Sequence, residues 1–268
     1  MSARAVVVHY AEIGLKGGNR HTFERRLGDR LREGLEHAGL RRKVSLIEGR
    51  FILPCEDDED VQAVVAVVTR IPGVAHAMPV LRTEPDMEAV KQAASQLLAE
   101  APPGTFKVES RRVDKSIEMT SIDISRDVAG RLGATSGRTA NVRMPDITVR
   151  VSWQKKEVLV SAHRVPGPGG LPVGSSGRLI GFLSGGLDSP VAVWHMLRRG
   201  ARVTAAHFHN RTMQGRAVLE KIEDLCGALA WPAGRMPLVV VPFEGCQRAI
   251  VAKVPAAYRM IVYRRAMF

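Results

Sequence analysis

The chain has 268 residues, 45% of them hydrophobic, and carries a formal net charge of +12 at pH 7. This length exceeds one small domain and fits two or three domains, and the apolar content is sufficient for sizeable cores. The excess of Lys and Arg favours a polyanionic partner, most simply a nucleic acid, although a basic protein can also be merely soluble.

The cysteines and the apolar runs of the sequence indicate in which cellular compartment the protein works. The three cysteines, Cys55, Cys226 and Cys246, include no CxxC pair and are odd in number. This pattern argues against a disulfide framework and for a reducing compartment. No apolar segment follows Met1, and no apolar run approaches the length needed to span a membrane. We therefore expect a cytoplasmic protein without a membrane partner.

The first part of the chain has the pattern of a small α+β module. A β-type run at 5–10 is followed by a polar, glycine-rich loop at 11–20. An apolar residue at every fourth position then predicts an amphipathic helix. This apolar stripe consists of Phe23, Leu27, Leu31 and Leu35. A hairpin over 44–53, an acidic helix start at 56–60 and a short strand near 78–81 complete an order close to the ferredoxin-like arrangement.

Basic residues crowd around this first helix, off its apolar stripe. A solvated surface is the usual interpretation of such charges, and an RNA-facing surface is the alternative. The candidate RNA-contacting residues here are Lys16, Arg20 and Arg25.

A second unit begins near Thr83, with a predicted helix over 87–98 and a strand over 105–110. The strand ends in a basic cluster, which gives three further candidates for RNA contact: Arg111, Arg112 and Lys115. A helix capped by Ser121 follows. Three strands are then predicted, at 139–144, 147–153 and 157–164. Because the chain has only three tyrosines, we expect contacts to phosphates and to RNA shape rather than base stacking.

The glycine- and proline-rich stretch up to Gly177 marks the clearest boundary in the sequence. A short apolar strand over 179–183 follows, then the turn Ser184 to Ser189, and then a helix that ends near Gly200. Asp188 or Ser189 is the expected helix cap, with Pro190 at the first helical position. A helix N-terminus behind a glycine turn presents free N–H groups and a positive dipole end, and is therefore a ready anion site.

The turn has no Lys after its glycines, so it is not a Walker loop, and it lacks the spacing of a dinucleotide fold. Its sequence, Ser-Gly-Gly-Leu-Asp-Ser, resembles the pyrophosphate loop of enzymes that cleave ATP between the α- and β-phosphates. Strands at 201–208 and 238–241, alternating with helices at 214–229 and from Tyr258, predict a parallel sheet. Because ligands bind at the carboxyl edge of such a sheet, His207 and Phe208 are expected beside the loop.

Five blocks spread over most of the chain resemble the ThiI family of tRNA 4-thiouridine synthetases. These blocks are residues 10–20, 70–74, 105–112, 169–174 and 183–190. The resemblance implies an α+β ferredoxin-like domain (1–58), a THUMP RNA-binding domain (59–165), a linker (166–177) and an α/β pyrophosphate-loop ATPase domain (178–268).

The resemblance also implies the chemistry. ATP adenylates a uridine oxygen in tRNA, at position 8 in the family, and a persulfide sulfur from a cysteine desulfurase displaces AMP. Mg²⁺ accompanies ATP and is not held by a protein-only site. A role in thiamine thiazole synthesis, with a sulfur-carrier protein as partner, is associated with the family, and a homodimer is left open. Asp188 is the implied catalytic residue; the implied ATP contacts are Phe182, Leu183, Ser184, Gly185, Gly186, Asp188, Ser189, His207, Phe208 and Arg264.

Family members continue beyond the position of Phe268, and their sulfur-handling cysteine lies there. We therefore expect an incomplete α/β domain and assign no catalytic cysteine. Two alternatives remain open at this point: a tRNA-binding module without turnover, and another pyrophosphate-loop adenylase.

Overall fold

The computed structural model describes residues 3–113, 117–210 and 215–268. Its contacts separate two compact units, residues 1–169 (unit 1) and 170–268 (unit 2). Each unit has its own sheet and its own core. The predicted position of Lys115 lies outside the described residues.

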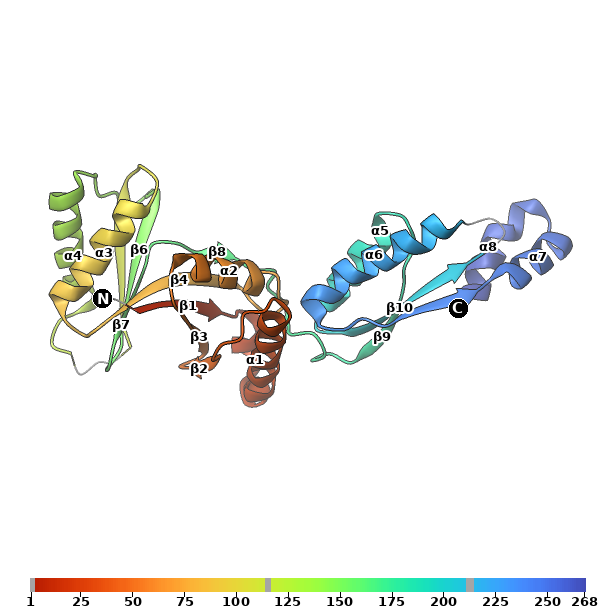
Figure 1. The fold of residues 1–268 in the computed structure, drawn as a ribbon, viewed down its shortest axis with the longest axis horizontal. Coiled ribbons are helices and arrows are strands. Elements are labelled where there is room, and N and C mark those ends of the chain that lie inside the picture. Colours follow the sequence, from red (N-terminus) through yellow and green to blue (C-terminus); the bar gives the residue numbers. More distant parts are fainter. Residues whose placement is uncertain (1–2, 114–116, 211–214) are drawn as a thin grey trace. The chain divides into compact units, whose positions relative to one another are not determined.

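One mixed sheet runs through unit 1 (Figure 1). In spatial order its strands are β2 (Ser45–Ile47), β3 (Arg50–Cys55), β1 (Ala3–His9), β4 (His76–Thr83), β7 (Val158–Ser161), β6 (Ile147–Trp153) and β5 (Phe106–Arg112), with β8 (Val165–Pro166) paired to β4. Neighbouring strands are antiparallel except β5 and β6, which are parallel. Strand β4 joins the two halves, because it pairs with β1 along its length and with β7 over 81–83.

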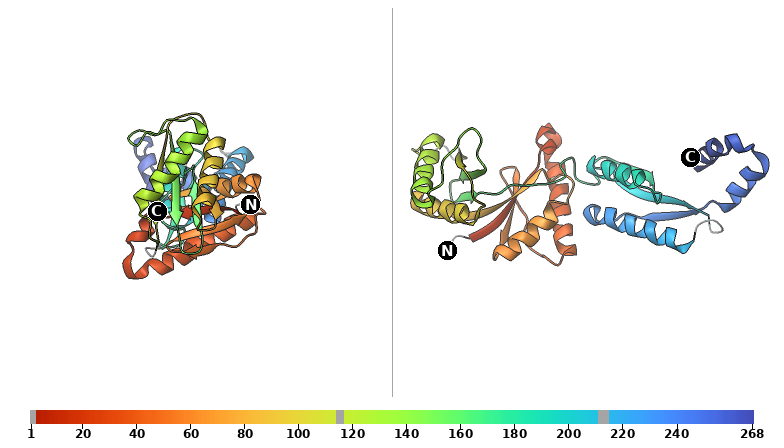
Figure 2. Two further views of the ribbon diagram at one scale, coloured as in Figure 1. Left: turned by 90° about the vertical axis from the view of Figure 1, so that its left-hand side faces the viewer. Right: turned by 90° about the horizontal axis from the view of Figure 1, so that it is seen from above.

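Four helices and two short 3-10 turns complete unit 1. The helices are α1 (Arg20–His37), α2 (Asp58–Val68), α3 (Met87–Glu100) and α4 (Ser121–Ser136), and the turns are η1 (Glu12–Leu15) and η2 (Gly17–Asn19). The leucines of the predicted α1 stripe, Leu27, Leu31 and Leu35, are buried. Helices α3 and α4 lie side by side against the β5 half of the sheet (Figure 2). The predicted hairpin is confirmed as β2–β3, with Glu48 and Gly49 both at positive φ in the turn.

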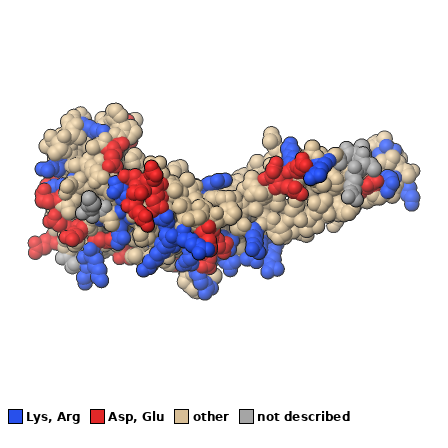
Figure 3. Space-filling model, in the orientation of Figure 1, with Lys and Arg blue, Asp and Glu red and all other residues tan. Residues whose placement is uncertain are grey.

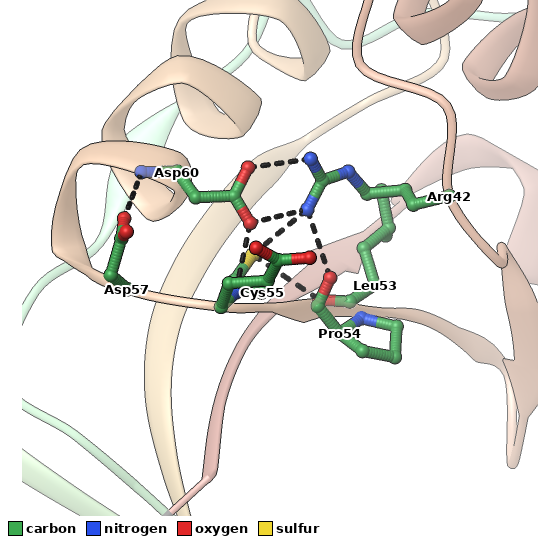
Figure 4. A network of polar contacts seen from close by, with 7 residues as sticks. Arg42, Leu53, Pro54, Cys55, Asp57 and Asp60 are labelled. Carbon is green, nitrogen blue, oxygen red and sulfur yellow. Dashed lines mark hydrogen bonds and ion pairs between the residues drawn. The ribbon is translucent and has the colours of Figure 1, made fainter.

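A polar network fastens the start of α2 to the end of β3 (Figure 4). The Arg42 guanidinium donates two hydrogen bonds to the Asp60 carboxylate, at 2.5 and 2.7 Å, and one to the Pro54 carbonyl at 3.0 Å. The pKa of the Asp60 carboxyl is lowered, chiefly by the hydrogen bonds from Arg42. Burial raises the pKa of the neighbouring Cys55 thiol to about 11, so this thiol is a poor nucleophile at neutral pH.

Two predictions in the second half of unit 1 are wrong. The expected strand at 139–144 is a loop that makes only an isolated bridge between Ala140 and Phe106. The Asn141 side chain accepts from the backbone N–H groups of Arg143 and Met144, and this local turn replaces a sheet ladder. The N-cap of α4 is Thr120 rather than Ser121, because Thr120 and Asp123 form a reciprocal capping box.

The predicted linker is bonded to structure at both of its ends. In unit 1, Gly169 exchanges backbone hydrogen bonds with Gly73 and Val74. In unit 2, the Leu171 N–H donates to the Arg198 carbonyl, and the Gly174 N–H donates to Gly200. Each side of the linker is therefore hydrogen-bonded within its own unit.

Unit 2 has a parallel three-stranded sheet, as predicted, in the order β11 (Leu238–Pro242), β10 (Arg202–His209), β9 (Arg178–Phe182). Helices α5 (Asp188–Arg198) and α6 (Arg216–Ala233) pack together on one face and enclose the core. Cys226 is part of this core, and burial raises the pKa of its thiol. Helices α7 (Glu244–Lys253) and α8 (Ala256–Met267) follow. Apolar side chains of β9 and β11 remain exposed, among them Ile180 and Val239.

Candidate nucleotide site and basic surface

The glycine turn between β9 and α5 is closed by its two serines. The Ser184 N–H donates to the Ser189 hydroxyl oxygen at 2.8 Å, and the two hydroxyl oxygens lie 2.9 Å apart. Because the Ser189 hydroxyl is engaged in this way, it does not cap the helix. The helix begins at Asp188, with Leu187 at the N-cap position and no side-chain cap, so the expected helix start at Pro190 is wrong by two residues.

This geometry leaves the backbone of the turn accessible. A Cβ atom on Gly186 would approach only the Ser184 hydroxyl oxygen, at 3.6 Å, and Asp188 is exposed at the start of α5. The uncapped first turn of α5 offers N–H groups and the positive end of the helix dipole. The turn can therefore accept an anion such as a polyphosphate.

Close packing beneath the turn depends on Gly181 in β9. A Cβ atom there would lie 2.8 Å from a methyl group of Val193 in α5 and 3.0 Å from a methyl group of Val203 in β10. The absent side chain lets α5 approach the sheet, and this approach sets where the helix N-terminus lies.

The end of β10 lies beside the turn, as expected for a carboxyl edge. The Leu183 N–H donates to the Ala206 carbonyl at 2.9 Å, and the His207 Nδ1 atom lies 2.9 Å from the Leu183 carbonyl oxygen. The His207 ring is buried, and its contact with the Leu183 carbonyl fixes the backbone just before the turn. Phe208 packs edge-on against Phe182 at 5.2 Å between ring centroids. Nucleotide contacts of His207 and Phe208 stay predictions.

Helix α8 returns the chain to the same edge of the sheet. The ring of Phe268, directly after α8, lies 5.3 Å from the ring of Phe182. Arg264 lies one helical turn earlier and is exposed. An exposed guanidinium in this position can reach an anion without breaking an internal ion pair. Its role in nucleotide binding stays a prediction.

Sequence reasoning missed Lys221, which lies on α6. Its side chain passes over Gly185: the position of a Cβ atom on Gly185 would be 3.8 Å from the Lys221 Cδ atom and 4.0 Å from its Nζ atom. No motif spacing connects this lysine to the turn. The packing of α6 beside α5 on the same face of the sheet brings the two together.

Lys and Arg side chains gather over the α1 part of unit 1 (Figure 3). Among the predicted RNA contacts there, Arg25 is exposed, and Lys16 lies over the ring of Phe23 with its Nζ atom 5.1 Å from the centroid. Arg20 is engaged internally, because its guanidinium donates to Glu24 at 2.9 Å and to the Tyr10 hydroxyl at 2.6 Å. Arg25 is therefore the most available of the three for a phosphate.

The basic cluster at the end of β5 also contains one exposed arginine and one arginine that is engaged in internal hydrogen bonds. Arg111 is exposed. Arg112 donates to the backbone carbonyls of Ile117 and Met119, at 3.0 and 2.8 Å, and so holds the segment before α4. Removing Arg112 would disturb the fold as well as any RNA contact.

In the described parts of the chain, no three His, Cys, Asp or Glu residues are grouped so that they could hold a metal ion. Asp188 is an oxygen donor beside the turn, which suits a Mg²⁺ ion that is already carried by a nucleotide phosphate. Across the same residues, no helix combines the length and apolar character required to span a membrane.

Known protein families match three consecutive parts of the chain. Residues 5–77 match the ThiI ferredoxin-like domain, residues 84–163 the THUMP domain, and residues 174–268 the thiamine biosynthesis protein (ThiI) family. The predicted combination of α+β ferredoxin-like and THUMP domains with an α/β parallel-sheet domain is thereby confirmed. The exact limits predicted for these domains stay predictions.

Curated relatives align with nearly the whole length of the chain. The chain is 36% identical over 266 residues to "Probable tRNA sulfurtransferase" of Moorella thermoacetica, covering 98% of this chain and 67% of that protein. A protein of the same name from Brevibacillus brevis is 36% identical over 270 residues, with coverage of 100% and 67%. The chain thus spans about two thirds of the length of these relatives.

Two solved structures share the fold. One is described as "Crystal structure of a 4-thiouridine synthetase - RNA complex with bound ATP"; it has a TM-score of 0.88 and 30% identity, with coverage of 99% of this chain and 69% of that one. The other, PH1313 from Pyrococcus horikoshii, has a TM-score of 0.80 and 22% identity, with coverage of 99% and 92%.

The fold and the glycine turn define a THUMP-containing protein with a pyrophosphate-type loop on a parallel sheet. The chain belongs to the ThiI family of tRNA sulfurtransferases. The family resemblance drawn from the five sequence blocks is confirmed.

Proposed function

We propose that this chain carries out the ATP-dependent step of sulfur transfer to tRNA, in which a uridine, at position 8 in the family, becomes 4-thiouridine. The observation that carries the proposal is the open, uncapped glycine turn at the carboxyl edge of the unit 2 sheet. The solved relative that is described with bound ATP and RNA supports the same assignment.

Each part of the turn has a role in this reaction. The N–H groups of Gly185 and Gly186, with the Ser184 and Ser189 hydroxyls, bind the β- and γ-phosphates of ATP. Asp188 would supply a carboxylate ligand to a Mg²⁺ ion carried by ATP, which would neutralise phosphate charge. The uracil 4-oxygen attacks the α-phosphorus, the bond between the α- and β-phosphates breaks, and pyrophosphate leaves with the electron pair while the uracil N3 proton passes to water. Adenylation is required because a carbonyl oxygen is a poor leaving group until it is activated.

The remaining steps need partners. The terminal sulfur of a persulfide from a cysteine desulfurase attacks the activated carbon of the base and displaces AMP. A second thiol then attacks the inner sulfur, the S–S bond breaks, the thiocarbonyl base is released, and the disulfide left behind is reduced by a cellular dithiol. Cys55 and Cys226 offer little for this relay, since burial raises the pKa of both thiols, whereas Cys246 is exposed. The proposal includes a link to thiamine thiazole synthesis through a sulfur-carrier protein, and it leaves a homodimer open.

Unit 1 binds the tRNA in this proposal. Exposed Arg25 and Arg111 are the described residues best placed to contact phosphates, because their guanidinium groups are not committed to the fold as those of Arg20 and Arg112 are. Such contacts neutralise phosphate charge and position the RNA without reading its sequence.

The test is AMP formation from ATP with and without unmodified tRNA, in the wild-type chain and in Asp188→Ala. We expect tRNA-dependent AMP formation in the wild type and a decrease of roughly 100-fold or more in Asp188→Ala. The matched control is Asp224→Ala, which removes an exposed aspartate of α6. AMP formation that is independent of tRNA, or that persists in Asp188→Ala, would contradict the proposal.

A second candidate is a tRNA-binding module that does not turn over ATP. It is favoured by the exposed apolar side chains on β9 and β11, which leave part of the unit 2 sheet uncovered. The same assay separates the two candidates: tRNA binding without any AMP would favour the module.

A further inference from the structure

Lys221 is an exposed lysine on α6 whose side chain extends over Gly185 of the glycine turn. Its Nζ and Cδ atoms would lie 4.0 and 3.8 Å from a Cβ atom on Gly185, and no other atom in the described chain would come within 4 Å of that position. These distances are ordinary contact distances, so the Lys221 side chain lies directly against the turn at Gly185.

The Lys221 ammonium is free of internal partners among the residues that the structure describes. Other basic side chains of the protein do form ion pairs. Arg216, five residues earlier on α6, pairs with Glu220 at 3.0 Å, and Lys91 of unit 1 pairs with Glu88 and Asp127. No such ion pair or hydrogen bond engages Lys221 within the described chain. An ammonium that lies unpaired over a turn of N–H groups adds a full positive charge to a site that already attracts anions.

We propose that Lys221 binds the β,γ-diphosphate part of ATP and the pyrophosphate that leaves from it. The glycine turn has no lysine of its own after the glycines, which is where a Walker loop supplies one. Here a helix that follows the next strand supplies the charge from above the turn. A lysine suits this role because its ammonium acts as a compact point charge toward phosphate oxygens.

The proposal rests on the proposed function but concerns one part of the nucleotide only. When the α–β bond breaks, negative charge accumulates on the departing pyrophosphate. The Lys221 ammonium lies beside Gly185. In the proposed function the N–H group of Gly185 binds the diphosphate part of ATP. Its effect therefore belongs to ligands that carry this diphosphate and not to AMP.

The experiment measures dissociation constants of ATP, AMP and inorganic pyrophosphate by titration calorimetry, with Mg²⁺ present, for the full chain and its Lys221→Ala and Lys221→Arg variants. We expect Lys221→Ala to weaken ATP and pyrophosphate binding roughly 10- to 100-fold and to change AMP binding by less than about twofold. Lys221→Arg keeps the charge and retains most of the affinity. The control variant is Lys253→Ala, an exposed lysine of α7, which leaves all three constants unchanged.

Three results would overturn the inference. They are unchanged ATP affinity in Lys221→Ala, an equal loss for ATP and AMP, and a wild-type chain that binds neither ATP nor pyrophosphate. The last result also contradicts the proposed function. A wild-type chain that binds ATP through Lys221 but forms no AMP would support the inference while the proposed function fails.

Discussion

Two histidines of unit 1 stack against each other at the junction of β1 and β4. The rings of His9 and His76 are parallel to within 11°, with centroids 4.5 Å apart, and the His76 Nδ1 atom lies 3.0 Å from an Arg164 guanidinium nitrogen. Burial is the main cause that lowers the pKa of both rings from 6.5 to about 4. At His9 the charge of His76 is the next cause, and nearby arginines add to the effect at both rings. The arginines concerned are Arg50, Arg111, Arg150 and Arg164.

This pair makes the folding of the chain sensitive to mild acid. A histidine whose pKa is lower in the folded state than in the unfolded state binds fewer protons when folded. Well above pH 6.5 the histidine pair does not change the free energy of unfolding. This free energy falls as the pH decreases from about 6.5, and the contribution of the pair becomes constant again below about pH 4. We expect the free energy of unfolding to fall by about 2 kcal/mol for each ring between pH 7 and pH 5, and so by up to about 4 kcal/mol for the pair.

Urea unfolding at the two pH values checks this expectation. The His76→Gln variant should lose part of the pH dependence, whereas His37→Gln, at an exposed position near the end of α1, should keep all of it. Equal pH dependence in the wild type and in His76→Gln would show that the stacked pair is not its source. The carboxyls with lowered pKa values, such as Asp60, titrate below this window.

At the level of single residues, the sequence predicted the groups that belong to a local pattern. The turn from Ser184 to Ser189 was identified because its residues are contiguous and follow a strand. Lys221 was not, because its approach to Gly185 depends on how α6 packs beside α5. The internal engagement of Arg20 and Arg112 was equally invisible, since a side-chain partner cannot be assigned from charge patterning alone.

The packing of α5 on β9 depends on one glycine, which gives a prediction at the level of elements. In Gly181→Ala the new Cβ atom would contact Val193 and Val203 at 2.8 and 3.0 Å, so the helix must move away from the sheet. We expect a loss of about 1–3 kcal/mol in the free energy of unfolding, together with weaker ATP binding because the N-terminus of α5 shifts.

The matched substitution is Gly227→Ala on α6, where a Cβ atom would meet nothing within 4 Å. It should stabilise the chain by up to about 1 kcal/mol, because alanine is the better helix former. Denaturant unfolding of the two variants gives opposite signs if the close approach is real. Similar effects in both would show that packing at Gly181 is not tight.

The elements that were predicted correctly have strong periodicity or clear turn residues, as in α1, α3 and the β2–β3 hairpin. The segment at 139–144 was predicted wrongly, because its apolar residues alternate as in a strand. The Asn141 side chain instead accepts hydrogen bonds from the backbone N–H groups of Arg143 and Met144. The helix start at Asp188 was missed because proline is typical of the first position of a helix, which predicts a start at Pro190. The Ser189 hydroxyl instead accepts from the Ser184 N–H, and the helix begins two residues earlier. Helix α7 was not predicted, and its residues carry little apolar periodicity.

At the level of the whole molecule, the two family domains of unit 1 share one sheet. The ThiI ferredoxin-like match ends at residue 77 and the THUMP match begins at residue 84, and β4 lies between β1 and β7 at this junction. The pairing of Leu81 with Val160 joins residues far apart in sequence. Local patterns predict strands but not such pairings, so two separate modules were expected where one continuous sheet exists.

This continuity predicts that residues 1–169 fold as one cooperative body without unit 2. All strands of the eight-stranded sheet, and the core clusters of described residues that pack against it, belong to this fragment. We expect the isolated fragment to unfold in a single transition that coincides with one transition of the full chain, when both are followed by circular dichroism in urea.

The fragment should also retain the tRNA affinity of the full chain to within about threefold, because the exposed arginines Arg25 and Arg111 both belong to it, and its affinity should fall steeply with added salt. Filter binding at two salt concentrations measures this. Two separate transitions in the fragment would show that the shared sheet does not couple its halves. Loss of tRNA binding on removal of residues 170–268 would place the main RNA contacts in unit 2.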